Sequence, residues 1–216
     1  MSSERRPRVL LADDHLLVAE ALTSLLTPEF DLVGVVEDGR ALLEAAGKLH
    51  PDVIVADVSM PHLNGIDALA QLRQGGDRTP VVFLTMHRDV TFARRALDAG
   101  ASGFVLKHSA SVELVAAIRA ALQGKTYLTP QLAGEVLEAM KEGSEQAGDP
   151  VASLTPRQRE VLQLLAEGRS AKEIAANLGI SARTVEFHKN QMMENLDLHT
   201  NAELIHFAIK HGLVEL

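Results

Sequence analysis

Five short apolar runs recur along the first half of the chain, and this repeat limits the possible folds more than any other feature. The runs cover residues 9–12, 33–36, 53–56, 81–84 and 103–106, and they begin about every 20 to 28 residues. None of them alternates with polar residues, which is typical of parallel strands buried on both faces. Helical patterns lie between them, such as an apolar stripe of Leu17, Ala21 and Leu25. The pattern predicts an α/β fold with five parallel strands and helices on both faces of the sheet.

Polar side chains directly follow four of these runs. Asp13 and Asp14 follow the first run, Asp57 the third, Thr85 the fourth and Lys107 the fifth. In a doubly wound, flavodoxin-like sheet of order 2-1-3-4-5, the first and third strands are neighbours, so these side chains should meet at one edge. Three carboxylates that lie close together need a proton or a cation, and an all-oxygen site of this kind suits Mg²⁺. We expect Asp57 to be a nucleophile toward phosphorus, with Thr85 and Lys107 on the phosphoryl oxygens.

Residues 8–124 resemble the receiver domain of two-component response regulators. The matching pieces are Leu11-Ala12-Asp13-Asp14-His15, the segment from Asp57 to Gly65, Leu84-Thr85 and Leu106-Lys107. The Mg²⁺ ligands that the resemblance implies are Asp13, Asp14, Asp57 and the backbone carbonyl of Ser59. It also implies that Asp57 is the phosphoacceptor and that a sensor histidine kinase is the donor.

The resemblance further implies a switch made of Thr85 and Phe104, in which the aromatic ring turns inward when the threonine moves toward the phosphate. Pro61 and Asn64-Gly65 are expected to serve backbone geometry in a turn. Two alternatives remain open. A phosphatase with an aspartate nucleophile would also use Mg²⁺, but it needs a second carboxylate where this chain has Ser59. A receiver that is only a phosphorylation-independent dimerisation module is the other alternative.

A change in composition marks the expected domain boundary. Residues 1–126 are assigned to the receiver domain and residues 127–150 to a linker. A helix is expected from Thr129 to Lys141, with Thr129 as its cap and Pro130 at its first position. The following segment from Glu142 to Pro150 has no apolar period and is typical of a flexible linker.

Residues 151–216 are predicted to form a small all-α domain of four helices. Two of the helices begin with capping boxes, at Thr155 and at Ser170, in which the cap and the third residue satisfy each other's backbone N–H groups. The third begins at Ser181, just after a turn at Gly179, and the fourth begins near Thr200. Two helices joined by a glycine-containing turn are the layout of a helix-turn-helix.

The third helix has a predicted core stripe of Val185, Met192 and Leu196. At 100° per residue, the opposite face holds Arg183, Glu186, Phe187, Asn190, Gln191 and Glu194. Residues 154–162 and 174–188 resemble the DNA-binding domain of NarL/LuxR-type regulators, and this resemblance implies that the exposed face enters the major groove of double-stranded DNA.

The resemblance implies base contacts from Glu186, Phe187 and Asn190. Chemically, these side chains suit the N4 amine of cytosine, the methyl group of thymine and the edge of adenine, respectively. Phosphate contacts are expected from Arg183, Thr184 and Lys189, and Gln191 is a further candidate on the same face.

The charge of the chain argues against strong binding to DNA by a single copy. The formal net charge is −8, and residues 151–216 hold 7 Lys and Arg against 8 Asp and Glu. Many relatives in the resembled family carry Lys where this chain has Glu186. We therefore expect a homodimer, formed on phosphorylation, that binds paired half-sites.

Two further absences narrow the class of protein. The sequence has no Cys, which excludes disulfides and thiolate metal sites, and it has no apolar stretch long enough to span a bilayer. We expect a cytoplasmic protein without a membrane partner. The sequence thus predicts a phosphorylation-controlled DNA-binding transcriptional regulator rather than an enzyme.

Overall fold

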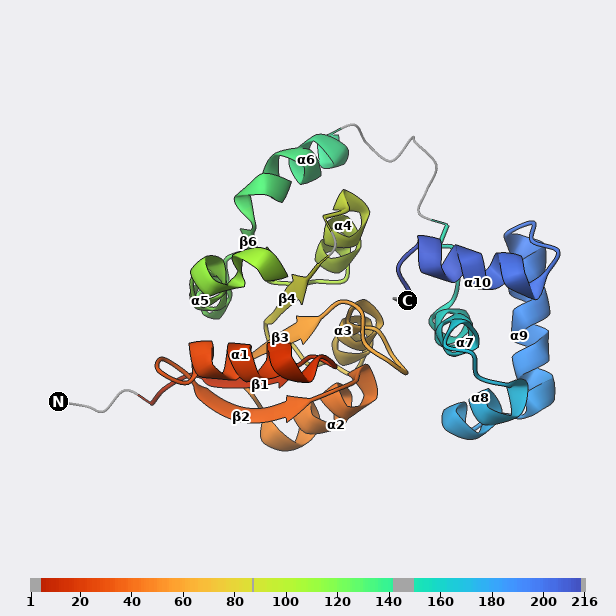
Figure 1. The fold of residues 1–216 in the computed structure, drawn as a ribbon, viewed down its shortest axis with the longest axis horizontal. Coiled ribbons are helices and arrows are strands. Elements are labelled where there is room, and N and C mark those ends of the chain that lie inside the picture. Colours follow the sequence, from red (N-terminus) through yellow and green to blue (C-terminus); the bar gives the residue numbers. More distant parts are fainter. Residues whose placement is uncertain (1–4, 87, 142–149, 215–216) are drawn as a thin grey trace. The chain divides into compact units, whose positions relative to one another are not determined.

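The computed structural model describes residues 5–86, 88–141 and 150–214. The chain divides into two compact units, one of residues 1–60 with 64–143 and the other of residues 61–63 with 144–216 (Figure 1). Of the predicted flexible linker, residues 142–149 lie outside the described part of the chain.

The first unit contains a parallel sheet of six strands in the order β2-β1-β3-β4-β5-β6. The strands are β1 (Arg8–Ala12), β2 (Asp31–Val36), β3 (Val53–Asp57), β4 (Val81–Thr85), β5 (Gly103–Leu106) and β6 (Tyr127–Leu128). The five predicted strands and their order are confirmed. The predicted strand count is wrong by one, because β6 adds a short edge strand that is too brief to give an apolar run.

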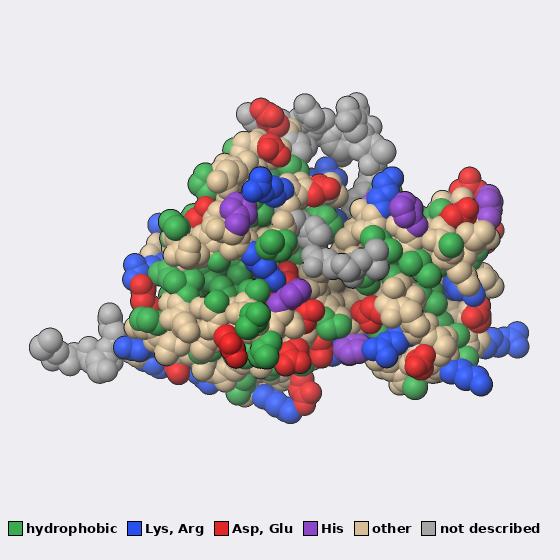
Figure 2. All heavy atoms as spheres, in the orientation of Figure 1, with side chains coloured by type: hydrophobic (Ala, Val, Ile, Leu, Met, Phe, Trp, Pro, Cys, Tyr) green, Lys and Arg blue, Asp and Glu red, His purple; other side chains and the backbone are tan. Residues whose placement is uncertain are grey.

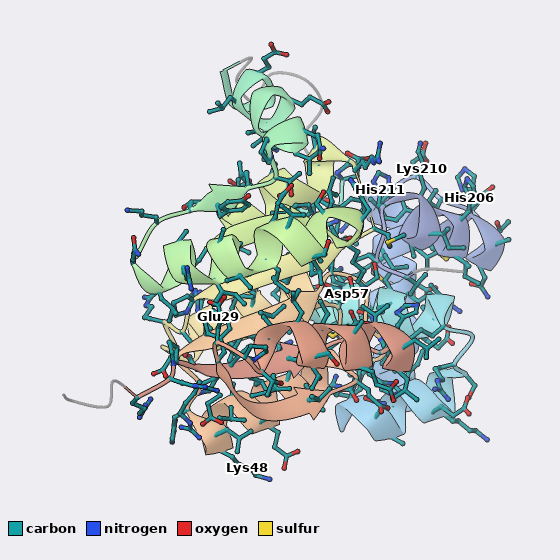
Figure 3. The ribbon with its side chains drawn as sticks, turned by 60° about the vertical axis from the view of Figure 1, so that its left-hand side comes forward. Glu29, Lys48, Asp57, His206, Lys210 and His211 are labelled. Carbon is teal, nitrogen blue, oxygen red and sulfur yellow. The ribbon has the colours of Figure 1, made fainter. Side chains whose placement is uncertain are left out.

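Helices cover both faces of this sheet, as predicted. The helices of the first unit are α1 (Leu16–Leu26), α2 (Gly39–Leu49), α3 (Gly65–Gln74), α4 (Val90–Asp98), α5 (Ala110–Leu122) and α6 (Pro130–Lys141), with a 3₁₀ turn η1 (Lys107–Ser109). Figure 3 shows α1 and α5 on the same face of the sheet. Alternate side chains of the strands, such as Val9 and Leu11, pack with residues of both helices in one core. The neighbouring residue Leu10 points the other way, toward Gly34 and Leu49 of α2.

One prediction about burial in this unit is wrong. The run at residues 33–36 is not buried on both faces, because β2 is an edge strand and Val35 is 46% exposed. On α1, the apolar stripe of Leu17, Ala21 and Leu25 is only partly buried: Leu25 packs against the core, whereas Leu17 is 79% exposed. The buried residues of this helix are Ala19, Leu22 and Leu26. Leu17 lines an open apolar groove between α1 and α5 instead, and hydrophobic side chains gather over this region in Figure 2.

The second unit contains α7 (Pro156–Ala166), α8 (Ala171–Leu178), α9 (Ala182–Asn195) and α10 (Asn201–Lys210) around one apolar core. The predicted capping boxes are present at Thr155 and Ser170. The side chain of each cap residue accepts the backbone N–H of the third helix residue, and the backbone N–H of the cap donates to the side chain of that residue, Gln158 or Glu173. The same motif begins α10 at Thr200. Between α8 and α9, Gly179 has φ 64°, a left-handed conformation that glycine adopts without strain. The predicted helix-turn-helix is confirmed.

None of the described helices is both long and apolar enough to cross a membrane.

Candidate functional site

The carboxyl ends of four neighbouring strands bring the predicted polar residues together. Asp57, which is labelled in Figure 3, is the last residue of β3. Thr85 is the last residue of β4, while Asp13 and Lys107 directly follow β1 and β5. The register aligns these ends, since Asp57 is paired with Leu84 and Thr85 with Leu106. Thr85 is fully buried and Asp57 is 3% exposed. Parallel topology therefore builds a polar pocket from residues up to ninety-four positions apart in the sequence.

Lys107 lies between two buried carboxylates. Its Nζ atom is 2.6 Å from Asp57 Oδ2 and 2.9 Å from Asp13 Oδ2, and the lysine side chain is only 8% exposed. Burial lowers the pKa of Lys107, but the charges and hydrogen bonds of Asp57 and Asp13 outweigh it and leave the pKa above its ordinary value. The ammonium thus stays charged and compensates part of the negative charge of the pocket.

Asp14 and His15 complete a cluster with Asp13 and Asp57. One ligand atom from each of these four residues lies within 4.8 Å of the others. His15 Nδ1 is 3.0 Å from Asp14 Oδ1, and the backbone N–H of His15 donates to Asp13 Oδ1 at 2.9 Å. No role of His15 was predicted from the sequence, although its position directly after the two aspartates places it beside them.

The donor set fits a hard divalent cation. Three carboxylates face one ammonium, which leaves the pocket negative, and oxygen ligands are those that Mg²⁺ prefers. Asp13 Oδ2 is buried, and its printed contact among the described residues is the ammonium of Lys107 at 2.9 Å. A buried carboxylate oxygen of this kind can accept a metal–ligand bond. Ser59 lies at the same place, with its N–H 3.4 Å from Asp57 Oδ1, while the predicted role of its carbonyl stays a prediction.

The start of α3 packs directly against the backbone of Asp57. Asn64 caps this helix by accepting the N–H of Asp67 at 2.9 Å, and the N–H of Gly65 donates to Val58 O at 2.8 Å. A Cβ atom on Gly65 would lie 2.1 Å from Asp57 O and 2.8 Å from a ring carbon of Phe83. Gly65 is therefore required for close packing, which is more than the turn geometry that the sequence predicted.

The two predicted switch residues lie on adjacent strands beside the pocket. Thr85 and Phe104 are both fully buried, and the backbone of Phe104 is paired with Phe83 of β4. The ring of Phe104 thus occupies the interior in this structure. Its movement with Thr85 stays a prediction.

The predicted recognition face lies on α9. Val185 and Met192 are buried in the core, and Leu196 packs against it one residue beyond the end of the helix. On the other side, the residues predicted to face DNA are exposed: Arg183, Glu186, Phe187, Asn190, Gln191 and Glu194. Phe187 is 56% exposed, and its ring contacts the ring of His188 edge-on, with the ring centroids 5.9 Å apart.

The two remaining candidates on α9 already have local partners. Lys189 Nζ is 2.5 Å from Glu186 Oε2, and the lysine side chain is only 16% exposed. Thr184 Oγ1 is 2.8 Å from the hydroxyl of the cap residue Ser181. The recognition face therefore carries an internal ion pair between Glu186 and Lys189, which the spacing of three residues permits but does not require.

Comparisons with known proteins identify a family for each of the two parts of the chain. Residues 9–119 match the family model of the response regulator receiver domain, and residues 152–208 match that of bacterial regulatory proteins of the luxR family. The transcriptional regulatory protein MctR of Rhizobium johnstonii is 36% identical over 99% of this chain and 98% of its own length.

Solved structures of RcsB are similar as well. The RcsB response regulator of Salmonella typhimurium is 28% identical, with a TM-score of 0.66 over 96% of this chain and 98% of that one. A structure of two RcsB dimers bound to two parallel DNAs has a TM-score of 0.60 and 27% identity over 94% of this chain and 98% of that one. With matching models at both ends and relatives similar along its whole length, the chain belongs to the response regulators that join a receiver domain to a luxR-family regulatory domain.

Proposed function

We propose that this chain is a phosphorylation-controlled transcription factor and that Asp57 accepts a phosphoryl group from a sensor histidine kinase. The observation that carries the proposal is the position of Lys107, which touches both Asp57 and Asp13 inside a pocket of carboxylates. A buried ammonium needs an acidic partner in any case, but Lys107 has two, and it lies where it could also bind the oxygens of a phosphoryl group on Asp57.

The pocket residues would divide the chemistry between them. An oxygen of Asp57 attacks the phosphorus of a phosphohistidine, the P–N bond breaks, and the imidazole leaves with the electron pair. Mg²⁺ held by Asp13, Asp14, Asp57 and the Ser59 carbonyl would neutralise the phosphoryl oxygens. Lys107 and the hydroxyl of Thr85 would bind the same oxygens from β5 and β4. The movement of Thr85, followed by Phe104, would then report the phosphoryl group to the surface.

The output would be binding of double-stranded DNA by α9. The exposed Asn190, Phe187 and Glu186 provide three different chemistries for base edges, and Arg183 is free of the core for a phosphate contact. In one of the similar structures, two RcsB dimers are bound to two parallel DNAs. We propose that this chain also acts as a homodimer, because a recognition helix with one internal ion pair gains little affinity as a single copy. Such a regulator would work in the cytoplasm.

Phosphoryl transfer from acetyl phosphate tests the proposal. The wild-type chain with Mg²⁺ should gain one phosphoryl group, seen by intact mass, that hydroxylamine removes. Asp57→Asn should gain none, whereas Asp52→Asn, at the opposite end of β3, should behave as wild type. Absence of an acylphosphate on the wild-type chain would contradict the proposal and favour a receiver that only dimerises. Continuous turnover of unrelated phosphoesters would favour an enzyme.

A further inference from the structure

The short strand β6 pairs in parallel with β5, the strand that carries Phe104 and leads to Lys107. Gly103 pairs with Tyr127 and Phe104 with Leu128. The N–H of Thr129 then donates to Phe104 O at 3.0 Å. The residue that follows Thr129 is Pro130, which begins α6, so the chain leaves the sheet at Thr129.

The hydroxyl of Thr129 extends this ladder by one step. It accepts the backbone N–H of Leu106 at 3.2 Å, which is the last residue of β5 before Lys107. It also donates to Glu113 Oε2 at 2.7 Å, in the first turn of α5. Thr129 was predicted to cap α6 and does stand at the N-cap position, but these bonds of its hydroxyl reach β5 and α5.

This junction is buried and polar, so its geometry is costly to disturb. Thr129 has no exposed surface, and a buried N–H or carboxylate that loses its partner is strongly destabilising. Burial raises the pKa of the Tyr127 phenol, and the charge of Glu113 raises it further, which places a second group of β6 close to the same carboxylate. Thr129, Glu113 and the end of β5 are therefore held as one cluster.

The rest of α6 packs against α4, and its residues Leu132 and Val136 are buried. The helix is thus connected to two of the strands whose ends form the pocket. It packs against α4, which follows β4 and Thr85 in the chain, and it follows β6, which pairs with Phe104 on β5. In the sequence, α6 is the last element before the segment that leads to the luxR-family domain.

We propose that α6 is the output element of the receiver domain and that Thr129 is the positioning residue that couples the end of β5 to it. This inference rests on the proposed function. When Thr85 and Phe104 respond to the phosphoryl group, β5 shifts against β6, and the Thr129 hydroxyl transmits that shift to the start of α6. Thr129 touches no phosphoryl oxygen and acts only through Leu106 and Glu113.

Hydrogen exchange of the full-length chain tests this coupling, with and without beryllium fluoride as a stable phosphoryl analogue. In the wild-type chain, the backbone amides of α6 should change their exchange rate when the analogue binds. Thr129→Val keeps the shape of the side chain but removes the hydroxyl, and its α6 amides should no longer respond. Thr129→Ser keeps the hydroxyl and should restore the response. Thr126→Val, at an exposed position just before β6, is the matched control and should behave as wild type.

A second readout separates coupling from stability. The ratio of DNA affinities with and without phosphorylation is measured on a sequence selected from a random pool by the phosphorylated wild-type chain. Thr129→Val should form the acylphosphate at the wild-type rate within about twofold, but the ratio should fall at least fivefold toward one. A Thr129→Val chain that is phosphorylated and keeps both the full affinity ratio and the α6 response would overturn this inference but not the proposed function. A Thr129→Ser chain that loses the response as the valine variant does would have the same consequence. A wild-type chain that forms no acylphosphate would overturn the proposed function and this inference together.

Discussion

The pocket of the receiver and the recognition face of α9 are built in opposite ways. The pocket gathers buried residues from the ends of four strands, and each is fixed by a close neighbour, such as Lys107 between Asp57 and Asp13. The recognition face comes from one helix, and its side chains are exposed to solvent. A site formed by the ends of several strands therefore depends on the packing beneath it. A site formed by one helix face depends only on which side chains that face carries.

Gly65→Ala should give the largest effect, because it changes the packing beneath the pocket. The added methyl group would lie 2.1 Å from Asp57 O, so the backbone that carries the phosphoacceptor must move. We expect a loss of about 3 kcal/mol in the free energy of unfolding and a large fall in the rate of acylphosphate formation. Urea denaturation and intact mass after acetyl phosphate treatment measure the two quantities.

The matched control is Gly47→Ala. Gly47 lies in the interior of α2, and a Cβ atom there would meet nothing within 4 Å. Alanine should stabilise the helix by about 0.5–1 kcal/mol without changing phosphorylation. Equal behaviour of the two variants would show that the pocket tolerates movement beneath it, which would break the first half of the comparison.

Lys107→Met tests the balance of charge within the pocket and should give the next largest effect. The variant removes the one ammonium that neutralises Asp13 and Asp57, so a cation should bind the carboxylates more tightly. We expect the affinity for Mg²⁺ to rise about tenfold, measured by calorimetric titration. The structural response to beryllium fluoride should be lost at the same time. A weaker affinity for Mg²⁺ would mean that the ammonium orders the carboxylates more than it competes with the cation.

These contrasts also explain how much the sequence could predict. Polar residues after strands are informative, because parallel topology forces their convergence, and Asp13, Asp57 and Lys107 do meet. The role of Gly65 was not predictable, because it depends on a distance of ångströms between elements that the sequence does not encode. The strand β6 could not be predicted for a related reason: a strand of two residues has no periodicity, and its pairing with β5 depends on where α5 ends.

The helix α1 shows a different limit on what the sequence can predict. The helix carries apolar residues on more than one side, so its period allows two stripes, and only packing selects Ala19, Leu22 and Leu26 as the core face. On α9 the charged residues leave a single apolar stripe, and the helical wheel therefore identified both the core residues and the exposed face. The internal pairing of Glu186 with Lys189 needed coordinates, because a spacing of three residues permits an ion pair without requiring it.

Glu186→Gln tests the exposed site, where a single side chain should matter without any packing effect. The change releases Lys189 from its ion pair and leaves it able to contact a phosphate. We expect DNA affinity to rise a few-fold and the slope of log affinity against log salt to steepen by up to about 0.9, with stability changed by less than about 0.5 kcal/mol. Fluorescence anisotropy over a salt series measures the slope.

Glu194→Gln is the control for this variant. It removes the same charge from the same exposed face about two turns further along α9. An identical steepening in both variants would mean that net charge alone sets the affinity, and that the ion pair of Glu186 with Lys189 has no separate role.

Asp52→Asn should have the smallest effect on stability. Asp52 is an aspartate at the amino-terminal edge of the same sheet, at the opposite end of the strands from the pocket. It accepts the backbone N–H of Arg8 at 2.8 Å and pairs with Arg5 at 2.9 Å. The bond from Arg8 chiefly, helped by Arg5 against the effect of burial, holds the pKa of Asp52 below its ordinary value.

A lowered folded-state pKa means that the ionised form stabilises the fold above the unfolded-state pKa of about 3.9, and that this stability is lost as the pH falls through the folded-state value. Asp52→Asn should therefore cost less than about 1 kcal/mol at pH 7, because the side chain is about a third exposed and solvent screens its charge. The difference from wild type should begin to shrink near pH 4 and close as the pH falls through the lowered folded-state pKa, as urea denaturation at pH 7 and over a series of acidic pH values would measure. A difference that persisted at low pH would assign the effect to the shape of the side chain, and the two edges of the sheet would then differ in more than the charge of their aspartates.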